Sequence, residues 1–305
     1  MFIYGDEYDL GWSTHVFPVD KYRRVFDTIN AEGIAVEQDI LAPRPATKEE
    51  LLLVHDENYL EELEILTKTP MMGIVRFEAP IERKTLDAVY AATGGSIIAL
   101  TEAVKRNEAW VNLGGGFHHA YPGHGEGFCF INDIGVSIRA AQRAGLVKSV
   151  LVVDCDLHQG NGTAKIFEND DSVFTLSIHQ ERLYPVKERS SLDIGLDNRT
   201  GDDEYLALLG GGIEKALDGR KFDLVFYVAG ADPFEHDQLG NLMLTKDGLK
   251  RRDQLVLSTA GKLGLPLAAV LAGGYSTDTQ DVVDIHVELC RQVKAFNTEH
   301  HSATS

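Results

Sequence analysis

The stretch Ser149-Val-Leu-Val-Val-Asp-Cys-Asp-Leu-His158 predicts the fold of this chain. Its first half, residues 149–153, is short and almost entirely apolar, which is typical of a strand buried on both faces of a parallel sheet. Polar groups follow at once, with carboxylates at Asp154 and Asp156 and an imidazole at His158. Ligands gather outside the carboxyl ends of such strands, so this stretch also indicates a functional site.

Outward from this strand, apolar runs alternate with helical patterns. The further runs are residues 109–113, 173–178, 224–228 and 267–271, and the helical patterns are residues 133–144 (ending at Gly145), 202–217 and 249–263, the last entered through Thr245 as an N-cap, with a capping box from Thr47 to Glu50. This alternation predicts a single α/β domain with a mainly parallel sheet and helices on both faces. We expect the domain to cover residues 1–296 and residues 297–305 to form a frayed, flexible tail.

Composition excludes several classes of function. The chain has 305 residues and a net charge of −18, with no Lys/Arg-rich run, so tight binding to nucleic acid is not expected. The negative electrostatic potential of such a chain favours a basic peptide or polyamine as a substrate. An acidic surface can also simply keep a protein soluble. The first residues do not resemble a secretory signal, and no apolar run is long enough to span a bilayer. Three cysteines without CxxC spacing (Cys129, Cys155 and Cys290) indicate a reducing compartment, and we predict the cytoplasm.

Polar groups beside glycines follow four of the five apolar runs. These segments are Gly114-Gly-Gly-Phe-His-His119, Asp154-Cys-Asp-Leu-His158, Ala229-Gly-Ala-Asp232 and Ala272-Gly-Gly-Tyr275. Because the carboxyl ends of parallel strands lie at one edge of the sheet, we expect the four segments to meet there.

The spacing of Asp154, Asp156 and His158 predicts a metal site. In an extended strand, side chains at i, i+2 and i+4 point the same way, and buried charges without a partner are costly. A cation resolves this, and Asp232, which follows its own strand, can supply a third ligand. Two carboxylates and one imidazole leave a coordination position open, as catalytic zinc requires, although Fe²⁺ fits the same ligands. The alternative interpretation is a set of helix caps and solvated acids.

Two further groups at this predicted edge carry chemistry. His118 and His119 follow three glycines, and a histidine near a metal site can move protons. A phenol at Tyr275 can donate to a developing oxyanion. Both groups also have a simpler interpretation. The histidines can be a surface or structural pair, and Tyr275 can be a tyrosine that only packs. The remaining histidines are interpreted as structural or surface residues (His55, His124, His179, His236 and His286) or as part of the tail (His300 and His301).

At these residues the sequence resembles the histone deacetylase family, within the arginase/deacetylase superfamily. The resemblance covers most of the chain and rests on GGGFHHA (114–120), GFCFIND (127–133), VDCDLHQGNG (153–162), AGADPF (229–234) and LAGGY (271–275). In its short length and in the motif HVFP…KYRRV near the N-terminus, the chain is most similar to the class IV type or its bacterial relatives.

The resemblance implies a role for each matching residue. It assigns zinc (or Fe²⁺) binding to Asp156, His158 and Asp232, and catalysis to His118, His119 and Tyr275, with Asp154 and Asn161 as partners of the histidines. It also implies a structural potassium ion at Asp154, Asp156, His158, Ser177 and Ile178, and a substrate channel formed by Gly127, Phe128 and Tyr184. Asn161 departs from the class I pattern, which has Asp there. An amide stabilises an imidazolium less well than a carboxylate does, so we expect a lower pKa for His119.

The expected activity is zinc-dependent hydrolysis of acyl-lysine side chains, acetyl or longer, in peptides or proteins. An acetylpolyamine or other small-molecule amidohydrolase is the main alternative, although the added loop usual in those enzymes is not evident. Arginase-like chemistry needs a DAHxD pattern where this chain has DCDLH. A non-catalytic acyl-lysine reader should have lost Tyr275 or a histidine, and all are present. Acyl length, substrate and oligomeric state are not predicted.

Overall fold

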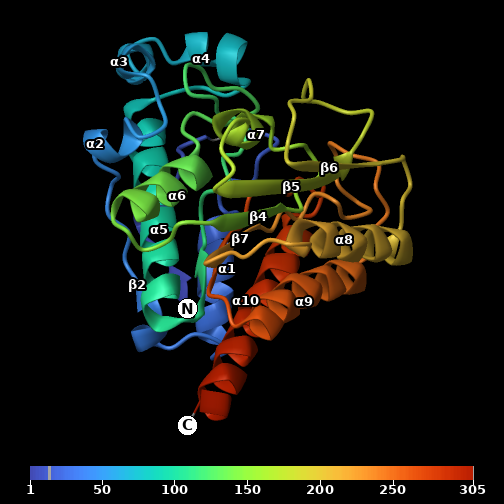
Figure 1. Ribbon diagram of the computed structural model, residues 1–305. Coiled ribbons are helices and arrows are strands. Elements are labelled where there is room, and N and C mark those ends of the chain that lie inside the picture. The colour runs from blue at the N-terminus through green and yellow to red at the C-terminus, as the bar shows by residue number, and fades with distance from the viewer. Residues whose placement is uncertain (13–14, 305) are drawn as a thin grey trace.

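A parallel sheet forms the centre of the computed structural model, which describes residues 1–12 and 15–304 (Figure 1). Eight strands are found among these residues, in the order β2-β1-β3-β8-β7-β4-β5-β6, and each pairs with its neighbours in parallel. The strands are β1 (Phe2–Ile3), β2 (Ile40–Leu41), β3 (Ala109–Asn112), β4 (Val150–Asp154), β5 (Val173–Gln180), β6 (Leu192–Leu196), β7 (Leu224–Val228) and β8 (Leu267–Val270).

Helices cover both faces of the sheet. They are α1 (Lys21–Ala31), α2 (Lys48–Leu51), α3 (Glu57–Leu66), α4 (Met71–Phe77), α5 (Arg83–Arg106), α6 (Asp133–Arg143), α7 (Asn161–Phe167), α8 (Asp202–Leu217), α9 (Lys246–Leu263) and α10 (Thr279–Thr304), with short 3-10 turns η1 (Asp6–Tyr8) and η2 (Glu37–Asp39). In Figure 1, α5 and α6 lie on one side of the sheet and α8, α9 and α10 on the other. Within the described part of the chain, no helix is long and apolar enough to cross a membrane.

Strand β4 shows why the sheet is buried on both faces. Val150 and Val152 pack in a cluster with residues of α5 and α6, whereas Leu151 and Val153 pack in a second cluster with residues of α8, α9 and α10. Successive side chains of a strand point to opposite faces, so an unbroken apolar run supplies both cores.

The predicted elements are largely confirmed. The strand predicted at 224–228 and the helix predicted at 202–217 match β7 and α8, and the other strand predictions differ from the structure by one or two residues at an end. Helix α9 starts three residues earlier than predicted, directly after Thr245, whose Oγ1 accepts the Gly248 N–H at 3.0 Å. The capping box between Thr47 and Glu50 is also present.

Some of the elements that were not predicted lack a clear pattern. Strands β1 and β2 have two residues each, which is too short for any periodicity. Helix α5 contains Gly94-Gly95, a pair that weakens a helical pattern. Both glycines are needed for packing, because an added Cβ would lie 1.7 Å from Arg44 O at Gly94 and 2.0 Å from Tyr8 Oη at Gly95.

The tail was predicted to start at Asn297, and this is wrong for that residue. Asn297 lies within α10, is 1% exposed, and exchanges two hydrogen bonds of 2.8 Å with the backbone of Ala109 at the start of β3. Its amide satisfies a strand end, which the polar composition of residues 297–305 does not reveal. Ser305 and the side chains of His300 and His301 lie outside the described residues.

Candidate active site

The four loops expected at one edge of the sheet do meet there. They follow β3, β4, β7 and β8, which are adjacent in the order β3-β8-β7-β4. The loops bring three potential metal ligands together: donor atoms of Asp156, His158 and Asp232 lie within 4.8 Å of one another, and all three side chains are buried.

Each of the two carboxylates binds a backbone N–H through one oxygen and faces His158 with the other. Asp156 Oδ2 accepts the Gly273 N–H at 2.9 Å, and Asp232 Oδ1 accepts the Leu157 N–H at 2.9 Å. Their other oxygens each lie 3.2 Å from His158 Nδ1. The backbone thus positions the ligand set, as a preformed site requires.

Two observations show that this donor set fits a divalent cation. Asp232 Oδ2 is buried and, although it lies 3.2 Å from His158 Nδ1, forms no well-directed hydrogen bond within the described structure. Burial, together with the charge of Asp156, raises the pKa of Asp232 to about 6. Two buried carboxylates repel each other unless a positive charge lies between them, and a cation removes this cost. Three protein ligands with an open position are typical of catalytic zinc, and Fe²⁺ takes the same donors.

Asp154 lies outside this cluster, although its spacing made it a candidate ligand. Its Oδ2 is 2.8 Å from His118 Nδ1, and its Oδ1 accepts the Asp156 N–H at 3.1 Å. Asp154 therefore orients His118 and the start of the ligand loop. On the sheet it pairs with Ser177 of β5, which, like Ile178, is buried. The potassium ion expected at these residues stays a prediction.

The two histidines form a continuous polar chain. His118 Nε2 and His119 Nε2 are 3.1 Å apart, and His119 Nδ1 lies 2.8 Å from Asn161 Oδ1. Burial opposes protonation of His118, but the charges of Asp154 and Asp156 outweigh it and raise its pKa to about 9. For His119, burial and the neighbouring His118 hold the pKa well below its usual value. The hydrogen bond with Asn161 opposes this shift, so the effect of Asn rather than Asp at this position stays a prediction.

Asn161 has a carboxylate behind it that the sequence analysis missed. Its Nδ2 donates to Glu126 Oε1 at 2.5 Å and to Tyr121 Oη at 3.0 Å. An amide whose N–H bonds a carboxylate has a more negative carbonyl oxygen, and that oxygen faces His119. Glu126 directly precedes Gly127, a predicted channel residue. This position was the one feature of the sequence that could have indicated a role for Glu126 in the site.

The loop that carries the histidines is fixed by Asp133, the first residue of α6. Its carboxylate accepts the N–H groups of Gly116 at 3.0 Å and of Phe117 at 2.8 Å. Gly115 and Gly116 have φ of +73° and +87°, a conformation that favours glycine, and an added Cβ at Gly116 would lie 2.5 Å from Ala272. The sequence pattern indicates Asp133 only as the start of a helix.

Tyr275 is fixed through its backbone. Its N–H donates to Asp237 Oδ2 at 2.7 Å, and its carbonyl oxygen accepts from Gln238 Nε2 at 2.7 Å. The ring is 7% exposed and packs edge-on against His158 and Phe128, with centroids 6.3 and 6.0 Å apart. Neither Asp237 nor Gln238 was predicted, because both lie within a polar loop after Asp232 that has no regular pattern.

The predicted channel residues lie around the histidines. The Tyr184 ring packs against His119 and His158, with centroids 5.3 and 6.1 Å apart, and is 40% exposed. An added Cβ at Gly127 would lie 2.6 Å from His119 Cδ2 and 2.7 Å from Tyr184 Oη. Phe128 is held at φ +66°, and its N–H donates to Phe77 O at 2.9 Å. Aromatic walls therefore lead from the surface to the buried ligands.

A buried lysine near Asp156 and Asp232 was also not predicted. Lys21, at the start of α1, is 0% exposed, and its Nζ donates to Ala272 O at 2.5 Å. Burial lowers the pKa of Lys21 to about 8, although Asp232 and Asp156 oppose this. Such a lysine cannot be distinguished in the sequence from an exposed one at a helix start.

The weaker histidines lie where they were expected. His55, His179 and His286 are buried but do not belong to the ligand group, and His124 and His236 are exposed. His55 Nε2, for example, accepts the Asn132 N–H at 3.0 Å, a structural contact.

Comparisons with known proteins identify the family. The histone deacetylase domain model matches residues 15–290. An uncharacterized protein of Picosynechococcus sp. is 40% identical over 285 residues, which cover 92% of this chain and 93% of that protein. Histone deacetylase 2 of Arabidopsis thaliana is 33% identical over 306 residues, covering 95% and 78%.

The solved structures agree in fold. The crystal structure of a histone deacetylase homologue from Aquifex aeolicus superposes with a TM-score of 0.80 at 24% identity, over 96% of this chain and 83% of that one. Because the domain model spans most of the chain, and a relative more than 30% identical covers nearly all of it, the chain belongs to the histone deacetylase family and is a hydrolase of that family.

Proposed function

We propose that this protein is a zinc-dependent deacylase that hydrolyses the N-acyl amide of lysine side chains. The observation that carries the proposal is the convergence of Asp156, His158 and Asp232 with the histidine pair in one buried site. Fe²⁺ in place of zinc is compatible with the same donors. A reducing, cytoplasmic location is supported by the three cysteines, all of which are free and buried.

Each residue of the site has a different role in the proposed reaction. Asp156, His158 and Asp232 would hold a zinc ion, which would supply Lewis-acid chemistry for polarising the amide carbonyl and lowering the pKa of water. His119 is buried with a low pKa, so its neutral imidazole can accept the proton of the attacking water through Nε2, while Nδ1 stays bonded to Asn161. The phenol of Tyr275 donates to the carbonyl oxygen as it becomes an oxyanion. A protonated His118 or His119 then gives a proton to the leaving amine.

The walls around the histidines support a lysine substrate. Gly127, Phe128 and Tyr184 surround an approach that suits an unbranched alkyl chain, since aromatic and backbone surfaces make apolar contacts with methylene groups. The potassium ion expected near Ser177 and Ile178 would be structural, with no part in proton transfer.

A kinetic panel tests the substrate class. Lysine peptides and polyamines, each with acetyl, butyryl, octanoyl and myristoyl groups, would be compared by kcat/KM. We expect acyl-lysine peptides to be the best substrates, because the narrow walls bind the lysine stem and the peptide backbone adds contacts at the rim. A higher kcat/KM for acylpolyamines would instead assign the protein to small-molecule amidohydrolysis.

Glu126→Gln tests the contact behind Asn161. We expect kcat to fall about tenfold with little change in KM, because a hydrogen bond to a charged group is worth about 1.5 kcal/mol or more and Glu126 acts through Asn161 on His119. Glu188→Gln is the matched control, since Glu188 lies 3.4 Å from Tyr121 Oη but does not contact Asn161. Equal effects of the two substitutions would contradict a specific role for Glu126.

A further inference from the structure

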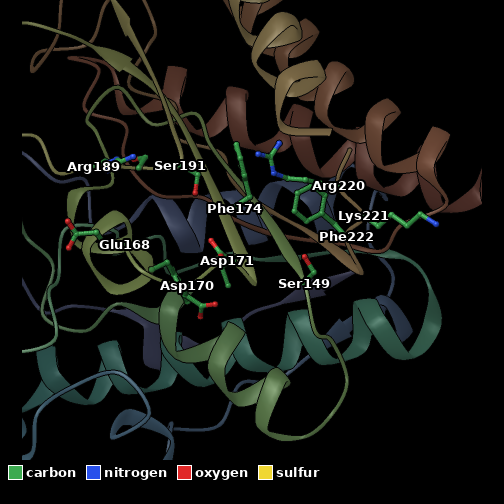
Figure 2. A pocket seen from close by; sticks show the side chains of 13 residues that line it. Ser149, Glu168, Asp170, Asp171, Phe174, Arg189, Ser191, Arg220, Lys221 and Phe222 are labelled. Atoms are coloured by element: carbon green, nitrogen blue, oxygen red, sulfur yellow. The ribbon is translucent and has the colours of Figure 1, made fainter. Parts of the chain in front are cut away.

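A second cavity lies at the opposite edge of the sheet from the proposed active site. Its volume is about 590 Å³, within the range of pockets that hold small molecules. It opens at the amino ends of β4, β5 and β7, and Figure 2 shows its side chains. The residues that line it are Ser149, Phe167, Glu168, Asp170, Asp171, Val173, Phe174, Arg189, Ser190, Ser191, Arg220, Lys221 and Phe222.

Two arginines of the cavity lack a carboxylate partner among the described residues. The side chain of Arg189 forms no ion pair there, and that of Arg220 donates only to the main-chain oxygens of Lys215 and Asp218, at 3.3 and 3.2 Å. Figure 2 shows Arg220 beside Phe174 and Phe222, on one wall. Both residues are exposed at the cavity, and guanidinium groups are preferred binding groups for phosphates.

The acidic side chains of the cavity are mostly neutralised by neighbours. Glu168 pairs with Lys165 at 2.8 Å, and Asp170 pairs with Arg139 at 2.5 Å. Only Asp171 has no cationic partner among the described residues. Two of the three carboxylates are thus paired with cations from outside the lining, which leaves Arg189, Arg220 and Lys221 available to bind an anion.

A buried hydroxyl gives independent evidence for a ligand. Ser190 lines the cavity and is 7% exposed, yet its Oγ has no hydrogen-bond partner in the described structure. Buried polar groups are nearly always satisfied, so a lone hydroxyl needs an explanation. A bound oxyanion beside Ser190 would supply the missing acceptor.

The wall that carries Arg189 and Ser190 is already ordered. The preceding residue, Glu188, exchanges two hydrogen bonds with the Gln159 side chain, at 2.7 and 2.8 Å. The Ser190 N–H donates to Asp193 Oδ2 at 3.0 Å, which fixes the next turn of the loop. A ligand would meet a preorganised surface and lose little affinity to ordering it.

One wall offers an aromatic face. Phe174 is only partly buried, its ring lies 4.8 Å from Arg220 Cζ, and its centroid is 6.3 Å from that of Phe222. A flat, polarisable group can stack on such a surface, as a nucleobase does on aromatic and guanidinium planes.

We propose that this cavity binds a phosphorylated small molecule of nucleotide size. Its phosphate groups bind Arg189, Arg220 and the Ser190 hydroxyl, and its planar part contacts Phe174. The site is separate from the proposed active site, because the amino and carboxyl ends of parallel strands lie at opposite edges of the sheet.

Calorimetric titration with ADP, AMP and inorganic phosphate, without Mg²⁺, tests the proposal on the full chain. We expect ADP to bind at one saturable site and more tightly than inorganic phosphate. Arg189→Glu and Arg220→Glu should each weaken ADP binding about tenfold or more, since each removes a charged hydrogen-bonding group. Lys68→Glu makes the same change of charge at an exposed position outside the cavity and should leave binding unchanged.

Ser190→Ala separates binding from folding. Its hydroxyl has no partner in the structure, so we expect the midpoint of thermal unfolding without ligand to stay the same or rise, whereas ADP binding weakens. Phe174→Leu should weaken ADP binding but not that of inorganic phosphate. Absence of saturable ADP binding would overturn the proposal, as would an equal loss of affinity in Lys68→Glu and the two arginine variants.

Discussion

Asp232→Ala is expected to lower kcat/KM for acyl-lysine peptides by about 10³-fold or more, because the metal supplies several kcal/mol of transition-state stabilisation. The substitution removes one of three ligands and leaves only Asp156 and His158. We expect elemental analysis to find about one zinc or iron per wild-type chain and a clear loss in the variant.

Protein stability gives a second measurement that does not depend on turnover. In the metal-free protein, burial and the charge of Asp156 raise the pKa of Asp232. Asp232→Ala should therefore unfold at the same temperature as chelated wild type, or higher. Asp223→Ala, which removes a carboxylate that only accepts the N–H groups of Lys148 and Ser149, should keep its metal. Wild-type metal content and turnover in Asp232→Ala would disprove the metal site.

His119→Ala is expected to lower kcat by about 10²–10⁴-fold, the range for loss of a positioned general base. His119 is buried, held by Asn161 at Nδ1, and directs Nε2 toward His118 and the ligand cluster. Metal content should stay at the wild-type level, because His119 does not belong to the ligand group. This separates the effect from that of Asp232→Ala.

His124→Ala serves as the matched histidine control. His124 is exposed and stacks on Tyr121, with ring centroids 4.3 Å apart, so it can affect the site only indirectly. We expect its kcat to stay near the wild-type value. If His119→Ala and His124→Ala turned over substrate equally well, the base would have to be another group.

The sequence predicted those parts of the fold and site that depend on short-range spacing. Strand β4 could be identified because apolar residues fill both faces, and Asp156 and His158 because they lie two residues apart at its end. Asp232 followed from the same rule applied to β7. The four-loop convergence needed only the principle that parallel strands end at one edge.

Contacts between residues far apart in the chain were decided by the tertiary structure alone. The Asn161–Glu126 hydrogen bond, the buried Lys21 and the unpaired arginines of the second cavity join loops and helices that the sequence does not relate. Asn297 at the end of a polar segment became part of the core because β3 offers it two backbone partners. The physical reason is the same in each case: a local pattern fixes the direction of a side chain, whereas its burial, pKa and partner are set by the chain that packs against it. Asp156, His158 and Asp232 are brought together in both cases, because the loops after β4 and β7 lie at the same edge of the sheet.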